Sequence, residues 1–352
     1  MKLPESIADF TPGLLSEALG GIGVAGVIAE PLGEGTGMMA EISRLTLKYD
    51  SDSGLPGCMI AKYTCSNPTN REIAISYNLY ERESRYFAEL DRFADIVTPQ
   101  IYHSSTDGQG MLILMEDLSD YAVGRQVVGA TLEQTELAID ELAKLHGAFW
   151  NRIEDLDWVP GIASSYHADN MLNLANLGWD NMILLFGEHV PDAVRSQRDA
   201  YLAAIPQIQA EQCDVPRTFL HGDFRMENLL YGTGPSHHPL VVIDWQGPLT
   251  GRGVVDVALF LGQSTSTAVR QNHERELLGR YVSGLAEAGV RDYDPETAFA
   301  HYRSAILYNW VYTAVVAGTL DASNEVAFAW MSEMVARQSA ASLDLEVFEL
   351  LP

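Results

Sequence analysis

The chain has 352 residues, of which 47% are hydrophobic and 20% are charged, a composition typical of a folded globular protein with room for two domains. Its formal net charge of −26 argues against nucleic acid as a partner, because phosphate backbones require clustered Lys and Arg. The three cysteines fit neither a disulfide framework nor a metal-site spacing, and no secretory leader pattern is present, so we expect a cytoplasmic protein. No apolar run reaches the length of about 20 residues that membrane insertion requires.

The first third of the chain alternates between strand patterns and helical spacing. Residues 5–20 predict a short amphipathic helix, and strand patterns follow between residues 27 and 63. Residues 71–92 have the spacing of a helix, and residues 101–115 have the pattern of a further hairpin. Antiparallel strands with one inserted helix predict a small β-rich lobe, which we assign to residues 1–117.

The remainder of the chain, residues 118–352, predicts a larger helical lobe. Thr131 and Gln134 form the sequence of a capping box, which opens a helix that extends to about Phe149. Further helices are expected at about 168–188, 192–211, 268–288, 294–319 and 322–343. One short β-rich segment, residues 219–245, interrupts them. The fold class is therefore α+β, with two lobes.

The β-rich segment carries the polar residues that phosphoryl transfer requires. Asp223 follows a strand, Asn228 comes five residues later in the same loop, and Asp244 ends the next buried strand. Phosphoryl transfer needs a base for the attacking hydroxyl and hard oxygen ligands for Mg²⁺. Any one of these residues alone would be an ordinary turn-capping residue. The ordered set indicates Asp223 as the catalytic base and Asn228 and Asp244 as metal ligands.

Three segments in this part of the chain resemble a known superfamily. His-Gly-Asp-Phe-Arg-Met-Glu-Asn at 221–228, the strand with Asp-Trp-Gln at 241–246 and the segment at 251–262 are similar to the aminoglycoside phosphotransferase superfamily, most of all to its ecdysteroid kinase-like branch. The resemblance extends from about residue 28 to about residue 320. It implies a protein-kinase-like fold and a phosphotransferase that uses Mg²⁺ and ATP, with GTP as the alternative nucleotide. It also implies the same roles for Asp223, Asn228 and Asp244.

The resemblance further implies phosphate contacts in the β-rich lobe. A glycine-rich turn that includes Gly35, Thr36 and Gly37 would cover the phosphates, although glycine clusters also mark ordinary hairpins. Lys62 lies within an apolar strand and would contact the phosphates and a carboxylate on the following helix. The alternative for Lys62 is an edge-strand position facing water.

Two further nucleotide contacts follow from the same resemblance. Alignment on the aromatic residues of the helix selects Glu83 as the partner of Lys62, with Glu81 as the second choice and a surface ion pair as the ordinary alternative. Glu116 and Leu118, in the connector between the lobes, would bind adenine through backbone groups.

Several polar residues near the predicted base are given structural roles. His221 is expected to fix the catalytic loop, and Asp256 is expected to brace that loop by accepting backbone N–H bonds. The adjacent His237 and His238 lack ligand partners at useful spacing, so no metal site is predicted there.

The phosphate acceptor is expected to be a small hydroxylated molecule that binds against the helical lobe. Large apolar and aromatic side chains in residues 157–212 and 295–320 favour an apolar acceptor, unless they form the helical core. These side chains are Trp158, Tyr166, Trp179, Met182, Phe186, Tyr308, Trp310 and Tyr312. The first alternative is an aminoglycoside or other cationic acceptor, which needs convergent acids. The second is a non-catalytic sensor of a nucleotide or metabolite, which would be expected to lack the base, the metal ligands or Lys62.

Overall fold

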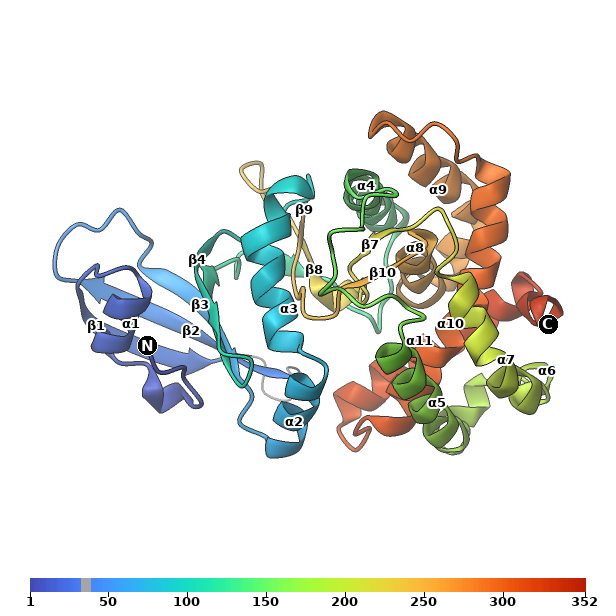
Figure 1. Cartoon of the computed structure of the whole chain (residues 1–352), viewed down its shortest axis with the longest axis horizontal. Helices are drawn as coiled ribbons and strands as arrows, with labels where there is room; N and C mark the ends of the chain where they lie inside the picture. The colour runs from blue at the N-terminus through green and yellow to red at the C-terminus, as the bar shows by residue number, and fades with distance from the viewer. Residues whose placement is uncertain (33–38) are drawn as a thin grey trace. The chain divides into compact units, whose positions relative to one another are not determined.

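The computed structural model describes residues 1–32 and 39–352, which group into two compact units. The first unit comprises residues 1–93, 97–121 and 242–247, and the second comprises residues 94–96, 122–241 and 248–352. A five-stranded antiparallel sheet characterises the first unit and helices dominate the second (Figure 1), which confirms the predicted α+β class. In the described part of the chain, no helix combines the length and apolar character needed to span a bilayer.

The sheet of the first unit has the strand order β1-β2-β3-β5-β4. Its strands are β1 (Val24–Pro31), β2 (Ala40–Tyr49), β3 (Cys58–Thr64), β4 (Ile101–Thr106) and β5 (Met111–Glu116). Because successive side chains of a strand point to opposite faces, the residues of β3 alternate between the two faces of the sheet. Met59, Ala61 and Tyr63 pack with the N-terminal helix α1 (Pro12–Ala18), whereas Lys62 is paired with Ile113, which belongs to the cluster on the other face.

Two helices and a π-helical turn follow β3, where the sequence predicts a single helix over residues 71–92. They are α2 (Pro68–Ser76), α3 (Leu79–Arg85) and a π-helical turn (Tyr86–Leu90). The single-helix prediction is wrong because Asn78 adopts the left-handed conformation, with φ 53°, and separates α2 from α3. Tyr80 of α3 packs in the same cluster as Ile113, so α3 lies on the face of the sheet that carries Lys62, opposite α1 (Figure 1).

The second unit contains eight α-helices of very different lengths among its described residues. They are α4 (Leu132–Ala148), α5 (Ser165–Phe186), α6 (Asp192–Arg195), α7 (Arg198–Glu211), α8 (Val254–Leu259), α9 (Thr267–Glu287), α10 (Pro295–Thr319) and α11 (Glu325–Asp344). The capping box at the start of α4 is confirmed, since Thr131 and Gln134 exchange both hydrogen bonds. The helix expected over residues 192–211 is instead two helices, α6 and α7, separated at Ser196 and Gln197.

Short strands surround the predicted catalytic loop. They are β6 (Ala122–Val123), β7 (Thr218–Leu220), β8 (Leu229–Tyr231), β9 (Leu240–Val242) and β10 (Leu249–Gly251). β7 pairs with β10, and β8 lies between β6 and β9. The loop from His221 to Asn228 therefore begins at the end of one small sheet and ends at the start of another.

Candidate active site

Lys62 lies between two carboxylates within the first unit. Its Nζ is 2.9 Å from Oε1 of Glu83 and 2.8 Å from Oδ1 of Asp244. The side chains of Lys62 and Glu83 are 7% and 1% exposed, so this is a buried ion pair and not a strand Lys facing water. Glu81, the second choice from the sequence, is instead 3.8 Å from Arg85 at the surface. The structure brings together Lys62, Glu83 and Asp244.

The charges of this cluster stabilise one another. Burial alone would lower the pKa of Lys62, but the negative charges of Asp244 and Glu83 outweigh burial and raise it. Burial raises the pKa of Glu83, and the ammonium of Lys62 opposes that rise. Lys62 therefore stays protonated and remains a cation that could bind phosphate oxygens.

The segment that carries Asp244 is held in the first unit by its own contacts. The indole ring of Trp245 stacks on Tyr86 with 3.8 Å between ring centroids, and the N–H of Val242 donates to the carbonyl of Val97. Asp244 itself has a left-handed backbone, with φ 67°, a conformation that Asp tolerates better than most residues. Its second oxygen accepts a hydrogen bond from Gln246.

A buried carboxylate braces the loop that carries Asp223 in the second unit. The two oxygens of Asp256 accept the backbone N–H groups of His221 and Gly222 at 2.7 and 3.1 Å. Nδ1 of His221 in turn accepts the N–H of Asp223 at 3.3 Å. Both structural roles expected from the sequence are present, and together they fix the backbone on which Asp223 sits.

The carboxylate of Asp223 accepts hydrogen bonds from three side chains. Oδ1 accepts the phenol of Tyr312 at 2.7 Å. Oδ2 accepts Nδ2 of Asn228 at 3.0 Å and Nε of Arg225 at 3.2 Å. Asn228 also donates to the backbone carbonyl of Asp223 at 2.8 Å. The side chain of Asp223 keeps 27% of its surface exposed, so a small molecule can reach it.

Arg225 belongs to the same cluster, although no role is predicted for it from the sequence. Its Nη1 is 3.1 Å from Glu227, and its guanidinium lies 5.2 Å from the ring centre of Trp330 on α11. Burial opposes the charge of Arg225, but the negative charges around it, led by that of Asp223, raise its pKa. The position of Arg225 two residues after Asp223 could have suggested the contact between these two residues. Nothing in the sequence pointed to the contact between Arg225 and Trp330.

The residues predicted to bind Mg²⁺ have the donor atoms that this ion prefers. Asn228 uses its amide nitrogen on Asp223, which leaves its amide oxygen as the atom that could face a cation. Asp244 supplies carboxylate oxygens. Across residues 1–32 and 39–352, no group of three or more His, Cys, Asp and Glu side chains is placed to hold a metal ion.

The predicted adenine contacts lie at and just beyond the end of β5. The N–H of Glu116 donates to the carbonyl of Gln100 and is therefore not available to a nucleotide. The carbonyl of Leu118 accepts the N–H of Tyr121 and keeps a second acceptor position. A hollow of about 420 Å³ lies beside them, and Glu116 and Asp117 both line it. Gly35, Thr36 and Gly37 fall outside the described residues.

A family model for the ecdysteroid kinase-like family matches residues 34–291. The chain belongs to the ecdysteroid kinase-like family. This confirms the resemblance found in the sequence and the expectation of a small-molecule kinase, a phosphotransferase with an alcohol group as acceptor. No curated protein is similar enough in sequence to be matched.

Solved structures show the same fold as this ecdysteroid kinase-like chain. An ethanolamine kinase of Plasmodium vivax is 14% identical, with a TM-score of 0.50, over 93% of this chain and 83% of its own. The GDP complex of wild-type aminoglycoside 2'-phosphotransferase-IIIa is 13% identical, with a TM-score of 0.56, over 94% and 97%. The GDP and kanamycin complex of APH(2")-IIIa is 14% identical, with a TM-score of 0.54, over 94% and 98%. At these identities the likeness establishes the kinase-like fold.

Most of the aromatic side chains proposed for the acceptor belong to the helical core of this ecdysteroid kinase-like chain. The buried members of the set are Trp179, Met182, Phe186, Tyr308 and Trp310. Tyr166 is exposed, and Tyr312 is the member that reaches Asp223. Helical spacing alone could not separate core residues from ligand contacts, so the aromatic set as a whole does not define an acceptor site.

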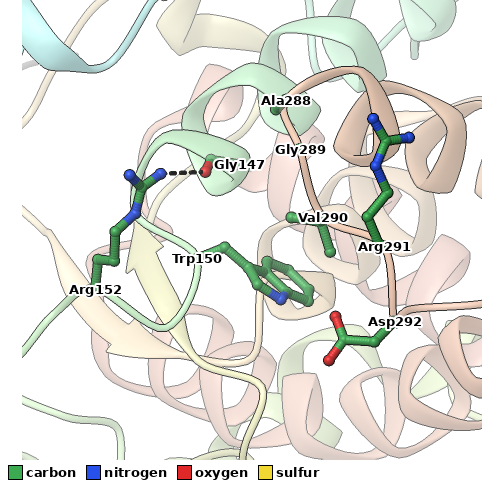
Figure 2. Close-up of a pocket in the computed structure, with 8 residues that line it drawn as sticks. All are labelled: Gly147, Trp150, Arg152, Ala288, Gly289, Val290, Arg291 and Asp292. Carbon is green, nitrogen blue, oxygen red and sulfur yellow. Dashed lines mark hydrogen bonds between the residues drawn. The ribbon is translucent and has the colours of Figure 1, made fainter.

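A second hollow, of about 430 Å³, lies on the surface of the second unit (Figure 2). Figure 2 shows Trp150 between Arg152 on one side and Arg291 and Asp292 on the other. Arg152 donates a hydrogen bond to the carbonyl of Gly147 at 3.2 Å. No residue predicted for catalysis or nucleotide binding lines this hollow, so it is separate from the candidate active site.

Proposed function

We propose that this chain transfers the γ-phosphoryl group of ATP to a hydroxyl of a small molecule, with Asp223 as the base. The oxygen of the acceptor hydroxyl forms the new bond to the γ-phosphorus, the bond to the bridging oxygen of ADP breaks, and Asp223 takes the hydroxyl proton. The arrangement of Asp223 carries this proposal, because a braced loop and three side-chain donors hold its partly exposed carboxylate in one orientation.

The nucleotide and metal roles follow from the remaining polar groups. Lys62 would bind phosphate oxygens, and Glu83 keeps its ammonium in place at 2.9 Å. Asn228 and Asp244 would hold Mg²⁺ through their oxygens. Bound there, Mg²⁺ would neutralise part of the charge on the phosphates. The cytoplasmic location predicted from the sequence, where cysteines stay reduced, remains part of this proposal.

We favour a hydroxylated apolar acceptor over a cationic one. Arg225 places a positive charge directly beside Asp223, and the neighbouring acid, Glu227, is already paired with it at 3.1 Å. Apolar side chains are exposed on α11, the helix that carries Trp330: Val326 is 63% exposed and Phe328 is 37% exposed. A cationic acceptor would need unpaired acids beside Asp223.

The decisive experiment measures Mg²⁺-dependent release of ADP over a panel of acceptors, for the wild type and for Asp223→Asn. The panel contains terpenoid, steroid and aromatic alcohols, aminoglycosides and simple amino alcohols. We expect turnover with apolar alcohols in the wild type and its loss in Asp223→Asn, while both proteins bind ATP in calorimetry. If both proteins bind ATP and give the same release of ADP with every acceptor, Asp223 is not the base and the proposal is wrong. If, in addition, no acceptor raises that release above its level without acceptor, the chain is a nucleotide sensor.

A further inference from the structure

Asp223 can accept one more hydrogen bond, and it can do so on only one of its two oxygens. An ionised carboxylate offers about four acceptor positions, two on each oxygen. Both positions on Oδ2 are taken, by Arg225 and by Asn228. Within residues 1–32 and 39–352, the phenol of Tyr312 is the one donor to Oδ1. An acceptor hydroxyl that gives its proton to Asp223 must therefore bind at Oδ1, next to the phenol of Tyr312.

The backbone that carries Tyr312 is fixed by a close contact between helices. Tyr312 lies on α10, which packs along α5 (Figure 1). A Cβ on Gly318 of α10 would collide with the carbonyl oxygen of Gly178 on α5, so the two backbones touch where neither residue has a side chain. Asn181 of α5 also donates to the carbonyl of Gly318 at 2.8 Å. These contacts hold α10 against α5 and so keep the backbone of Tyr312 in place beside Asp223.

The phenol of Tyr312 remains a hydrogen-bond donor. Burial raises the pKa of Tyr312 well above its ordinary value, and the negative charge of Asp223 raises it further. A neutral phenol donates one hydrogen bond, and the carboxylate at 2.7 Å receives it. The hydroxyl of Tyr312 therefore orients Asp223, while the ring beside it occupies space next to Oδ1.

We propose that Tyr312 is a positioning and specificity-determining residue, which orients Asp223 and borders the place where the acceptor hydroxyl binds on Oδ1. The inference rests on the proposed role of Asp223 as the base. Because the phenol occupies one side of Oδ1, the carbon that bears the acceptor hydroxyl must be small enough to fit beside the ring. Primary and unhindered secondary alcohols fit this place, and tertiary alcohols do not.

Tyr312→Phe tests the orienting role, because it removes the hydroxyl and keeps the ring. Loss of this hydrogen bond to a charged group should lower kcat about tenfold or more. The KM for ATP should not change. Tyr302→Phe is a matched control, since Tyr302 lies on the same helix and donates to the carboxylate of Glu274 at 3.3 Å, outside the Asp223 cluster. Tyr302→Phe should keep the kcat of the wild type. Thermal unfolding of both variants separates lost stability from lost orientation.

Tyr312→Ala tests the bordering role, because it opens the space beside Oδ1. We expect the ratio of kcat/KM for a tertiary alcohol to kcat/KM for its primary isomer to rise in this variant. The acceptor is the panel compound with the highest turnover, and its alcohol isomers complete the set. If no panel compound is phosphorylated, the kcat values of Tyr312→Phe and of the control Tyr302→Phe are measured for the slow hydrolysis of MgATP. In that reaction water takes the place of the acceptor hydroxyl.

The outcomes distinguish this inference from the proposed function. If Asp223→Asn is inactive but Tyr312→Phe equals the wild type in kcat and in the KM for the acceptor, the inference about Tyr312 is overturned and the function stands. The inference is also overturned if Tyr312→Phe and Tyr302→Phe lose kcat equally. If Asp223→Asn itself behaves as the wild type, the proposed function fails first.

Discussion

The ammonium of Lys62 lies 2.8 Å from Oδ1 of Asp244, although 182 positions separate the two residues in the chain. Glu83 binds the same ammonium from α3 at 2.9 Å. A single buried cation thus joins a strand, a helix and the returning segment Val242–Gly247 within the first unit. The stability of this unit and its proposed contact with phosphates both depend on that charge.

Lys62→Met should therefore destabilise the protein strongly. The substitution removes the cation and leaves the carboxylate of Glu83 buried, with only 1% of its side chain exposed. Breaking a buried ion pair in this way costs about 3–5 kcal/mol of unfolding free energy. Urea denaturation measures the loss. Lys48→Met on β2 is the control, because Lys48 is exposed and its replacement should change the free energy by no more than about 0.5 kcal/mol. Equal losses in both variants would disprove the structural role of the cluster.

Glu83→Gln should weaken ATP binding, whereas Glu81→Gln should not. Glu83 holds the ammonium of Lys62, while Glu81 faces solvent and is 3.8 Å from Arg85. Losing one charge-assisted bond to a phosphate-binding Lys should raise the Kd for ATP by about tenfold. Calorimetric titration of both variants gives the comparison. A larger effect in Glu81→Gln would show that the wrong acid has been assigned.

Asp256→Asn should loosen the catalytic loop without touching any proposed substrate contact. An amide nitrogen in place of one carboxylate oxygen would face the backbone N–H of His221 or Gly222, which that oxygen now accepts. A buried donor left without an acceptor costs about 1–3 kcal/mol. We expect lower kcat, a lower melting temperature and faster amide exchange at these two residues. Asp140→Asn, which removes a surface partner of Arg280, is the control and should leave kcat unchanged.

Two partly buried histidines predict a loss of stability in mild acid. Burial lowers the pKa of His103 and of His301 below the ordinary value of 6.5, and the charge of Arg252 lowers that of His301 further. Their contribution to stability is present above the pKa of the unfolded chain and is lost as pH falls towards the lower folded pKa, because the unfolded chain binds the protons first. Unfolding free energy should therefore decrease below about pH 6.5. His301→Gln should reduce that slope, and an unchanged slope would contradict this explanation.

The sequence was most informative where the relevant residues are close together in the chain. Asp223 and Asn228 lie in one loop, and Thr131 and Gln134 form one cap, so their contacts follow from local spacing. Glu83 could be selected because the aromatic residues around it align with the corresponding helix of the family that the sequence resembles. The break at Asn78 was missed, since helical spacing continues across a single left-handed residue.

Contacts between distant segments could not be predicted in this way. Tyr312 reaches Asp223 across 89 positions, and Trp330 meets Arg225 from a different helix. Both contacts depend on how α10 and α11 pack, which the spacing of apolar residues does not specify. The same limit explains why the sequence left open whether Trp179 and Trp310 contact a ligand or belong to the helical core, where both are buried.

Transfer of radiolabelled γ-phosphate from ATP to an acceptor alcohol tests the central claim most directly. The assay compares the wild type with Asp223→Asn at saturating ATP and Mg²⁺, and it follows the labelled phosphate ester. The proposed mechanism predicts label in the ester with the wild type and a loss of about a hundredfold or more with Asp223→Asn, because general base catalysis contributes about 10²–10⁴-fold. Equal labelling of the ester by both proteins would contradict the role of Asp223 as the catalytic base.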